Sequence, residues 1–239
     1  YDHVVGKATT FAEEAIGQIS AGKVMTLDVE FREFWGGIFS AHPWLAGPWE
    51  SYLGFWKKGG GSLGEHSHAI NLWQHFSNIL GAGRIVEVQA ALDFIETDKV
   101  NYDQVALLNF KTESGMIGRC VQDVVTEPPR KWARIQYENG FIEWNCNKEP
   151  GVDLVTIQDN NHQAEQTKFL KTRPDDFIQE LEHIHSVVMS NSKIDSPISM
   201  NKGAETMLVI AAAHLAHQKQ CTVTIDYSKG FIPQALKII

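Results

Sequence analysis

The chain of 239 residues has a formal charge of −8 and a pI near 5.7, and 43% of its residues are hydrophobic. This length and apolar content suffice for one large globular domain or two small ones. The acidic balance argues against nucleic acid or an anionic membrane as a partner, because both require a cationic protein face.

Two further absences in the sequence restrict its location. No stretch approaches the roughly 18 consecutive apolar residues of a membrane span, and the first residues lack an export signal. Cys120, Cys146 and Cys221 lie far apart in the sequence. This spacing predicts small core thiols rather than a disulfide framework or a zinc knuckle. We therefore expect a cytoplasmic protein.

The first third of the chain predicts a helix, a strand, a long loop and a second helix. Apolar residues at helical spacing occur over 11–19, and Gly22 follows as a candidate helix end. Alternating apolar residues predict a strand over 24–34. Residues 35–58 break both periodicities with glycine, proline and tryptophan and predict a loop. A buried helix is expected over 67–80.

The rest of the chain predicts a sheet followed by two helices. Six strand-like runs cover 85–95, 104–112, 115–125, 131–138, 141–146 and 153–159. The turns ESG and ENG between them are typical of hairpins, because glycine accepts a positive φ there. A polar surface connection is expected at 162–176, helices at 175–190 and 202–219, and a last strand at 221–227.

This order of elements predicts an α+β fold, with a large, mainly antiparallel open β-sheet and helices packed on one face. The strands carry apolar side chains on both faces. A broad sheet usually buries its open face, so we expect a second subunit to cover it.

The stretch GGGSLGEHSHAINLWQHF at 59–76 places three glycines, an acid and two histidines before a helix. On a continuous helix, Glu65, His68, Asn71 and His75 would form one polar stripe. A histidine can exchange a proton with a hydroxyl, and a carboxylate can fix its tautomer. An acid/base pair, a metal site and a capped helix with hydrated histidines all remain open. Because EHSH is not HExxH, we expect no metal.

Two other groups have competing interpretations. The histidines of EHIH at 182–185 diverge on a helix, which predicts a hydrated face. In the loop, Trp44 and Trp56 could stack on a sugar or a base, and Lys57 could meet an anion. Packing of the loop over the sheet explains them equally well. No Gly-rich GxGxxG opens a strand–helix unit in the sequence, and no Walker A motif occurs.

These motifs together resemble the C-terminal half of the glucose–fructose oxidoreductase/inositol dehydrogenase (Gfo/Idh/MocA) family. The matching features are the initial Tyr-Asp-His, the loop ending in WKKGGG, E-x-S-H-x-I-N, ENGFIEW and the closing TVTID. They span Tyr1 to about Tyr227. The N-terminal Rossmann domain of that family, with its E-K-P lysine, is not among these residues. We therefore expect residues 1–239 to be the C-terminal substrate-binding and oligomerisation domain of a longer enzyme.

The resemblance implies part of an NAD(P)-dependent dehydrogenase acting on a hydroxyl of a sugar, nucleotide sugar or cyclitol. It implies His68 as the proton acceptor or as the partner that orients the hydroxyl beside the family's lysine, and Glu65 as the acid that orients His68. The substrate contacts that we expect are His3, Trp44, Trp56, Lys57 and Asn71. Gly60 and Gly61 could touch the cofactor. Residues 1–239 alone are expected to bind neither NAD nor NADP and to be inactive.

Two expectations concern assembly. The resemblance implies a homodimer or homotetramer formed through the open sheet face. A binding or assembly module of the same fold without catalysis is the alternative function.

Overall fold

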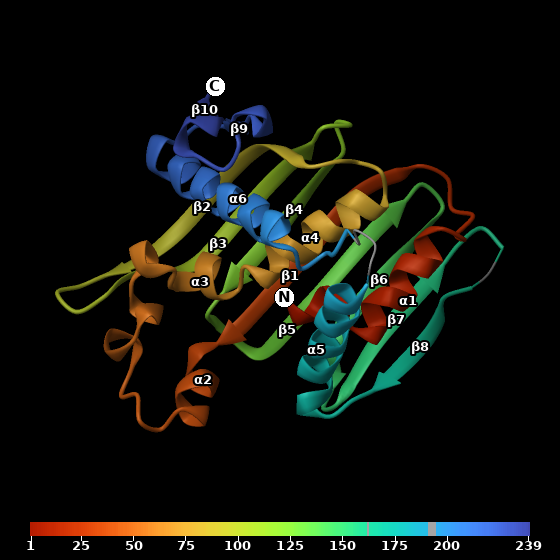
Figure 1. The fold of residues 1–239 in the computed structure, drawn as a ribbon, viewed down its shortest axis with the longest axis horizontal. Helices are drawn as coiled ribbons and strands as arrows, with labels where there is room; N and C mark the ends of the chain where they lie inside the picture. The colour runs from red at the N-terminus through yellow and green to blue at the C-terminus, as the bar shows by residue number, and fades with distance from the viewer. Residues whose placement is uncertain (162, 191–194) are drawn as a thin grey trace.

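A computed structural model describes residues 1–161, 163–190 and 195–239, which form one ten-stranded sheet with helices on one face (Figure 1). The strands are β1 (Val24–Phe34), β2 (Ile85–Glu96), β3 (Asn101–Thr112), β4 (Ile117–Asp123), β5 (Val125–Tyr137), β6 (Gly140–Glu149), β7 (Val152–Gln158), β8 (Glu165–Leu170), β9 (Val223–Ile225) and β10 (Leu236–Ile238). Their order is β10-β9-β2-β3-β4-β1-β5-β6-β7-β8. β1 and β4 run parallel, and the other neighbours pair antiparallel. The predicted fold class is confirmed.

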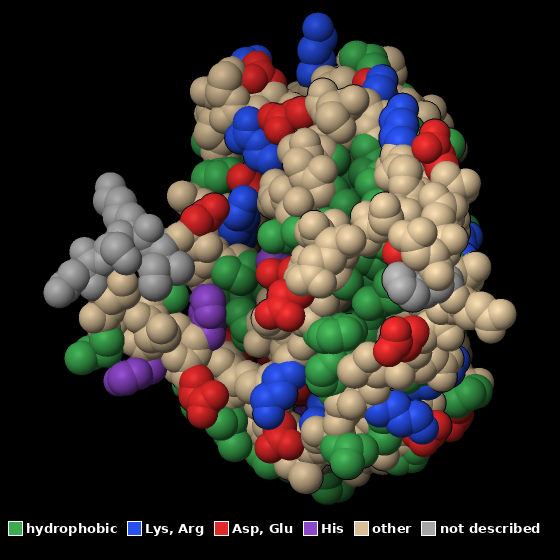
Figure 2. All heavy atoms as spheres, turned by 90° about the vertical axis from the view of Figure 1, so that its right-hand side faces the viewer, with side chains coloured by type: hydrophobic (Ala, Val, Ile, Leu, Met, Phe, Trp, Pro, Cys, Tyr) green, Lys and Arg blue, Asp and Glu red, His purple; other side chains and the backbone are tan. Residues whose placement is uncertain are grey.

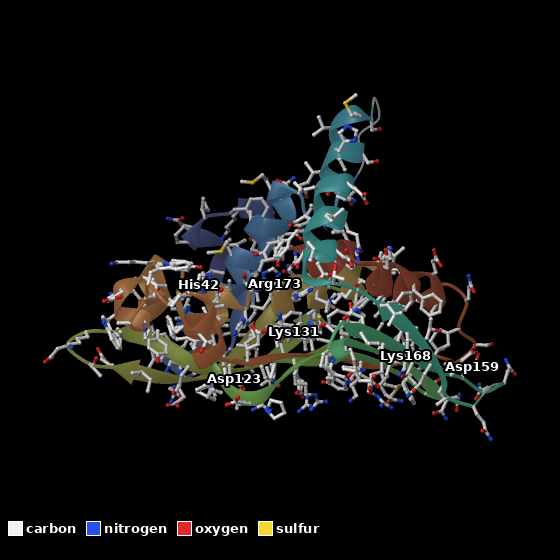
Figure 3. The ribbon with its side chains drawn as sticks, turned by 90° about the horizontal axis from the view of Figure 1, so that it is seen from below. His42, Asp123, Lys131, Asp159, Lys168 and Arg173 are labelled. Carbon is white, nitrogen blue, oxygen red and sulfur yellow. The ribbon has the colours of Figure 1, made fainter. Side chains whose placement is uncertain are left out.

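The helices divide into a packed layer and one projecting helix. They are α1 (Lys7–Ile16), α2 (Trp35–Ala41), α3 (Gly61–Glu65), α4 (His68–Ile79), α5 (Arg173–Met189) and α6 (Met200–Lys219). Short 3-10 helices are η1 (Asp2–Val5), η2 (Pro48–Glu50), η3 (Tyr52–Gly54), η4 (Trp56–Lys58), η5 (Tyr227–Lys229) and η6 (Pro233–Ala235). α1, α4 and α6 pack on the sheet, whereas α5 contacts η1 and stands away from the sheet (Figure 3). Among the described residues, no helix is long and apolar enough to cross a membrane.

Alternation along β1 separates the two faces of the sheet. Leu27, Val29 and Phe31 are buried beneath the helices. Trp73 of α4 packs into this layer and donates its indole N–H to the Leu27 carbonyl at 3.0 Å. Complete burial of a large apolar side chain contributes roughly 1.5–3 kcal/mol. The core therefore fixes α4, and with it the histidines at its start.

The opposite face of the sheet is more polar than the sequence suggests. Arg119 Nε lies 3.0 Å from Asp28 Oδ1, and Arg130 Nη1 lies 3.2 Å from Glu30 Oε2. Exposed Leu107 and Ile117 lie on this face with the ion pairs, and the Arg130 guanidinium covers the Trp132 ring there at 4.7 Å. We expected apolar strand faces here, and the structure shows a mixed surface.

Three local predictions were wrong. The first helix ends at Ile16 with Gly17 as its cap, so Gly22 is not its end. The segment 35–58 begins with α2 and continues through short 3-10 helices. Residues 165–170, predicted as a connection, form the edge strand β8; His162 of that prediction lies outside the described residues. β8 is polar on both faces, so it lacks hydrophobic alternation. Seen from this edge, charged side chains are interspersed with hydrophobic ones (Figure 2), which discourages further strand pairing.

Candidate functional site

A cavity of about 560 Å³ lies on the helix side of the sheet, between η1, the α3–α4 junction, β1, β5 and the start of α5. Figure 3 shows Lys131 of β5 on this side of the sheet, with Arg173 above it at the foot of α5. Ionisable side chains from all of these elements line the cavity. Most of them fall into three groups, which differ in how far their hydrogen bonds and charges are satisfied.

The glycine-rich stretch positions the start of α4. Gly61 has a φ of +79°, and a Cβ there would overlap the Asp103 carboxylate. That carboxylate accepts hydrogen bonds from Ser62 Oγ and Leu63 N, both at 2.7 Å, and thereby caps α3. A Cβ on Gly60 would collide with the backbone of η3. These glycines therefore permit close backbone packing, and their predicted cofactor contact stays a prediction.

The first group of cavity residues consists of Asp2, His3 and His68. Asp2 Oδ1 lies 3.4 Å from His68 Nδ1, and Asp2 Oδ2 lies 3.8 Å from His3 Nδ1. Burial lowers the pKa of His68 to about 4 although Asp2 opposes this change, and burial also lowers the pKa of His3. About a third of the His68 side chain is exposed, so solvent moderates the effect. Both rings are therefore neutral at pH 7.

The second group of cavity residues links His66 to Glu33 and Lys131. Glu33 Oε2 lies 3.3 Å from His66 Nδ1, and Glu33 Oε1 lies 2.9 Å from Lys131 Nζ. Burial would raise the pKa of Glu33, but the charge and hydrogen bond of Lys131 act together with the neighbouring histidines and lower it. Burial lowers the pKa of His66. Within the described residues, His66 Nε2 is buried without a hydrogen-bond partner.

The third group of cavity residues centres on Lys171. Its Nζ lies 2.9 Å from Asp153 Oδ2, 2.8 Å from Asp176 Oδ2 and 3.4 Å from Cys146 Sγ. Burial raises the pKa of Cys146 to about 12. The thiol is therefore protonated at neutral pH and is a poor nucleophile. This group satisfies its own charges.

Three predicted site residues share this cavity: His3, Glu65 and His68. Glu65 ends α3, before the turn that leads into α4, and its Oε2 accepts a hydrogen bond from Tyr52 Oη at 2.7 Å. The carboxylate beside His68 is that of Asp2 instead. The expected partner of His68 is thus replaced by a residue 66 positions away.

The other predicted site residues lie elsewhere. Trp56, Lys57 and Gly60 line a second cavity of about 450 Å³ against α6. There the Trp56 ring stacks on His214, with ring centroids 4.5 Å apart. The substrate contact predicted for Trp56 and Lys57 is therefore away from His68.

The remaining members of the predicted stripe and loop line neither cavity. Trp44 is 71% exposed and meets His42 edge-on. Asn71 is buried within α4, and His75 Nε2 lies 2.6 Å from Glu13 Oε1 of α1. The polar stripe is interrupted because α3 and α4 are separate helices.

Sequence reasoning missed Asp2, Glu33, Lys131 and Lys171. Asp2 lies in the Tyr-Asp-His stretch, where only His3 was assigned a role, and no local motif marks the other three. In an alternating strand, a charged residue such as Lys131 among apolar neighbours was the only available hint.

The described residues offer one possible metal cluster and no dinucleotide site. The donor atoms of Asp2, His3 and His68 all lie within 4.8 Å of one another. A Rossmann-type dinucleotide site uses a parallel βαβ unit with a glycine-rich loop. This sheet is almost wholly antiparallel, and its parallel pair β1–β4 lacks such a loop. The described residues therefore do not form a Rossmann-type dinucleotide site of their own.

Neither a protein-family profile nor a curated protein sequence matches the chain. Solved structures do match it. Levoglucosan dehydrogenase in complex with NADH and levoglucosan has a TM-score of 0.72 at 16% identity, over 93% of this chain and 64% of that one. Aldose-aldose oxidoreductase from Caulobacter crescentus, complexed with glycerol, has a TM-score of 0.72 at 16% identity. The match covers 94% of this chain and 62% of that one. An NAD binding oxidoreductase from Klebsiella pneumoniae has a TM-score of 0.72 at 14% identity, over 93% of this chain and 64% of that one.

The chain has the fold of Gfo/Idh-type oxidoreductases. It spans less than two thirds of the length of the structures it matches. The fold expected from the family resemblance is thereby confirmed, and at this identity the comparison establishes the fold alone.

Proposed function

We propose that residues 1–239 are the C-terminal substrate domain of an NAD(P)-dependent oxidoreductase that acts on a hydroxyl of a sugar, nucleotide sugar or cyclitol. The observation that carries this proposal is the neutral His68, beside the Asp2 carboxylate, in a polar cavity of an oxidoreductase fold. The matched structures support the substrate class because two of them contain levoglucosan or glycerol.

In this proposal, His68 receives the proton of the substrate hydroxyl. A carboxylate near Nδ1 favours the tautomer with hydrogen on that atom, which leaves Nε2 as the acceptor. Asp2 also stabilises the imidazolium that forms. Glu65, His3 and His66 line the same cavity and are placed to contact the other hydroxyls. Because these residues offer no dinucleotide site, we assign them no part in hydride transfer.

The direct test is turnover by the full-length protein. Purified protein is incubated with NAD⁺ or NADP⁺ and a panel of aldoses, their uronic acids, anhydrosugars and cyclitols, and reduced cofactor is measured by absorbance. The proposal predicts oxidation of at least one polyol by the full-length protein and none by residues 1–239 alone. Binding of polyols without turnover by the full-length protein would favour the non-catalytic binding module.

We also propose that the protein forms a homodimer or homotetramer through the open sheet face. The ion pairs Arg119–Asp28 and Arg130–Glu30, with exposed Leu107 and Ile117, give that face a mixed character suited to a specific interface. Light scattering coupled to size exclusion tests this. Residues 1–239 should elute at two or four times the chain mass of 26.8 kDa, and a monomer at tens of micromolar would contradict the proposal.

A further inference from the structure

We propose that Asp2, His3 and His68 form a binding site for a divalent transition-metal ion of the Zn²⁺ type. The sequence predicted no metal because EHSH is not HExxH. Asp2 and His3 precede that motif by more than 60 residues and share no spacing pattern with it. Folding of η1 against the start of α4 brings the three side chains together.

The distances suit the coordination of a small cation. A tetrahedral metal with bonds of about 2.0–2.2 Å holds neighbouring ligand atoms about 3.3–3.6 Å apart. Asp2 oxygens lie 3.4 Å from His68 Nδ1 and 3.8 Å from His3 Nδ1, and all three donors fit within 4.8 Å. Binding therefore requires only small side-chain rotations.

The hydrogen bonding of the cluster leaves a donor atom available. His68 Nδ1 is buried and has no hydrogen-bond partner among the described residues, although Asp2 is 3.4 Å away. A buried polar atom without a partner costs free energy unless a ligand satisfies it. A metal ion at the centre of the cluster would satisfy this nitrogen and the Asp2 carboxylate together.

The local charges also favour a cation. Among the described residues, the only ion-pair partners of Asp2 are the two histidines, and Glu65 has only the Tyr52 hydroxyl. The nearby Lys131 is already paired with Glu33 at 2.9 Å. A divalent ion would therefore meet uncompensated carboxylates rather than free ammonium groups.

Three protein ligands beside a cavity leave a coordination position for a substrate oxygen. This arrangement is typical of catalytic rather than structural metal sites. Two imidazoles and one carboxylate favour Zn²⁺ or another late first-row ion over Mg²⁺ or Ca²⁺, which prefer all-oxygen ligands. A role in catalysis rests on the proposed function: coordination through Nδ1 leaves the hydrogen of a neutral His68 on Nε2, so in the metal-bound form the ion would activate the hydroxyl in place of His68. Metal binding itself does not rest on it.

The experiment measures bound metal. Full-length protein is treated with a chelator, dialysed, loaded with Zn²⁺, freed of excess ion and analysed by elemental mass spectrometry. We expect about one Zn²⁺ at this site per chain. Asp2→Asn and His3→Gln should each weaken Zn²⁺ affinity by roughly 10-fold or more in a competition titration. His185→Gln, at an exposed histidine of α5, is the matched control and should retain full binding.

Two further measurements keep the result interpretable. Circular dichroism must show that a variant is folded before its metal binding is interpreted. Co²⁺ loading of the wild type should give visible absorption bands, and each folded cluster variant should lose them. Absence of Zn²⁺ in the wild type, equal binding by the cluster variants, or equal competition by Mg²⁺ overturns the site. Zn²⁺ binding without turnover of any polyol upholds the site and rejects the dehydrogenase function.

Discussion

The two ends of the cavity contain similar residue types in opposite states. At one end, Lys171 lies within 3 Å of both Asp153 and Asp176, so every charge has a partner. At the other end, Asp2 faces only the imidazoles of His3 and His68, and His68 Nδ1 lacks a hydrogen bond among the described residues. Buried polar groups that have hydrogen-bond partners stabilise a fold. Buried polar groups that lack a partner are candidates for contact with a ligand.

The largest expected effect is on kcat, which should depend on the Asp2–His68 end of the cavity far more than on the Lys171 end. In the full-length enzyme, His68→Gln removes the proton acceptor and should lower kcat by roughly 10²- to 10⁴-fold. Lys171→Met should change kcat far less, because the partners of its ammonium among the described residues are two carboxylates and Cys146. Steady-state kinetics with the best polyol decide the matter. An equal loss of kcat in the two variants would show that the two ends of the cavity do not differ in their role in catalysis.

The second largest effect is on the free energy of unfolding, which should depend on the Lys171 end of the cavity. Lys171→Met leaves two carboxylates uncompensated in a setting where the Lys171 side chain is only 10% exposed. Removing one partner of such a group should lower the free energy of unfolding by on the order of 3 kcal/mol, measured by urea denaturation. The control is Lys168→Met, whose side chain is 54% exposed beside Glu149. It should cost less than about 1 kcal/mol.

The pH dependence of kcat/KM tests whether His68 at the Asp2 end is neutral. His68 must be neutral to accept a proton, and burial lowers its pKa to about 4. The value of kcat/KM should therefore persist as the pH falls through 6.5 and decline only toward the lowered pKa. Asp2→Asn removes the carboxylate that raises this pKa, so the acid limb should move to still lower pH. An acid limb at or above 6.5, with the fold intact by circular dichroism, would contradict burial of a neutral His68.

The smallest effect concerns Glu65. Its carboxylate accepts a hydrogen bond from Tyr52 rather than from His68. Glu65→Gln keeps a hydrogen-bond acceptor and should lower kcat by less than about 10-fold, well below a positioned acid/base group. Tyr52→Phe is the matched variant and should have an effect of the same size. A loss as large as that of His68→Gln would restore Glu65 as the acid that orients His68.

The sequence predicted the sheet well because its central strands alternate apolar and polar residues and are joined by glycine turns. The strand β8 was not predicted because the first four residues of EQTKFL are polar, so the segment shows no alternation. The helix α2 was not predicted because WGGIFSA is short and contains two glycines. These elements form through pairing with β7 and packing near Val124 rather than through local pattern.

The site was only partly predictable, for a related reason. His68 and Glu65 lie in one motif, so sequence could place them near one cavity. Asp2 and Lys131 reach the same cavity from η1 and β5, and only the fold determines that contact. The expected pairing of Glu65 with His68 assumed a continuous helix, which the turn at His66 and Ser67 breaks.

A structure of the full-length protein with a bound polyol tests the central claim most directly. The account predicts one substrate hydroxyl about 3 Å from His68 Nε2, at the Asp2 end of the cavity and away from the Lys171 carboxylates. A polyol bound instead in the cavity of Trp56 and His214, or at the Lys171 end with His68 untouched, would contradict it.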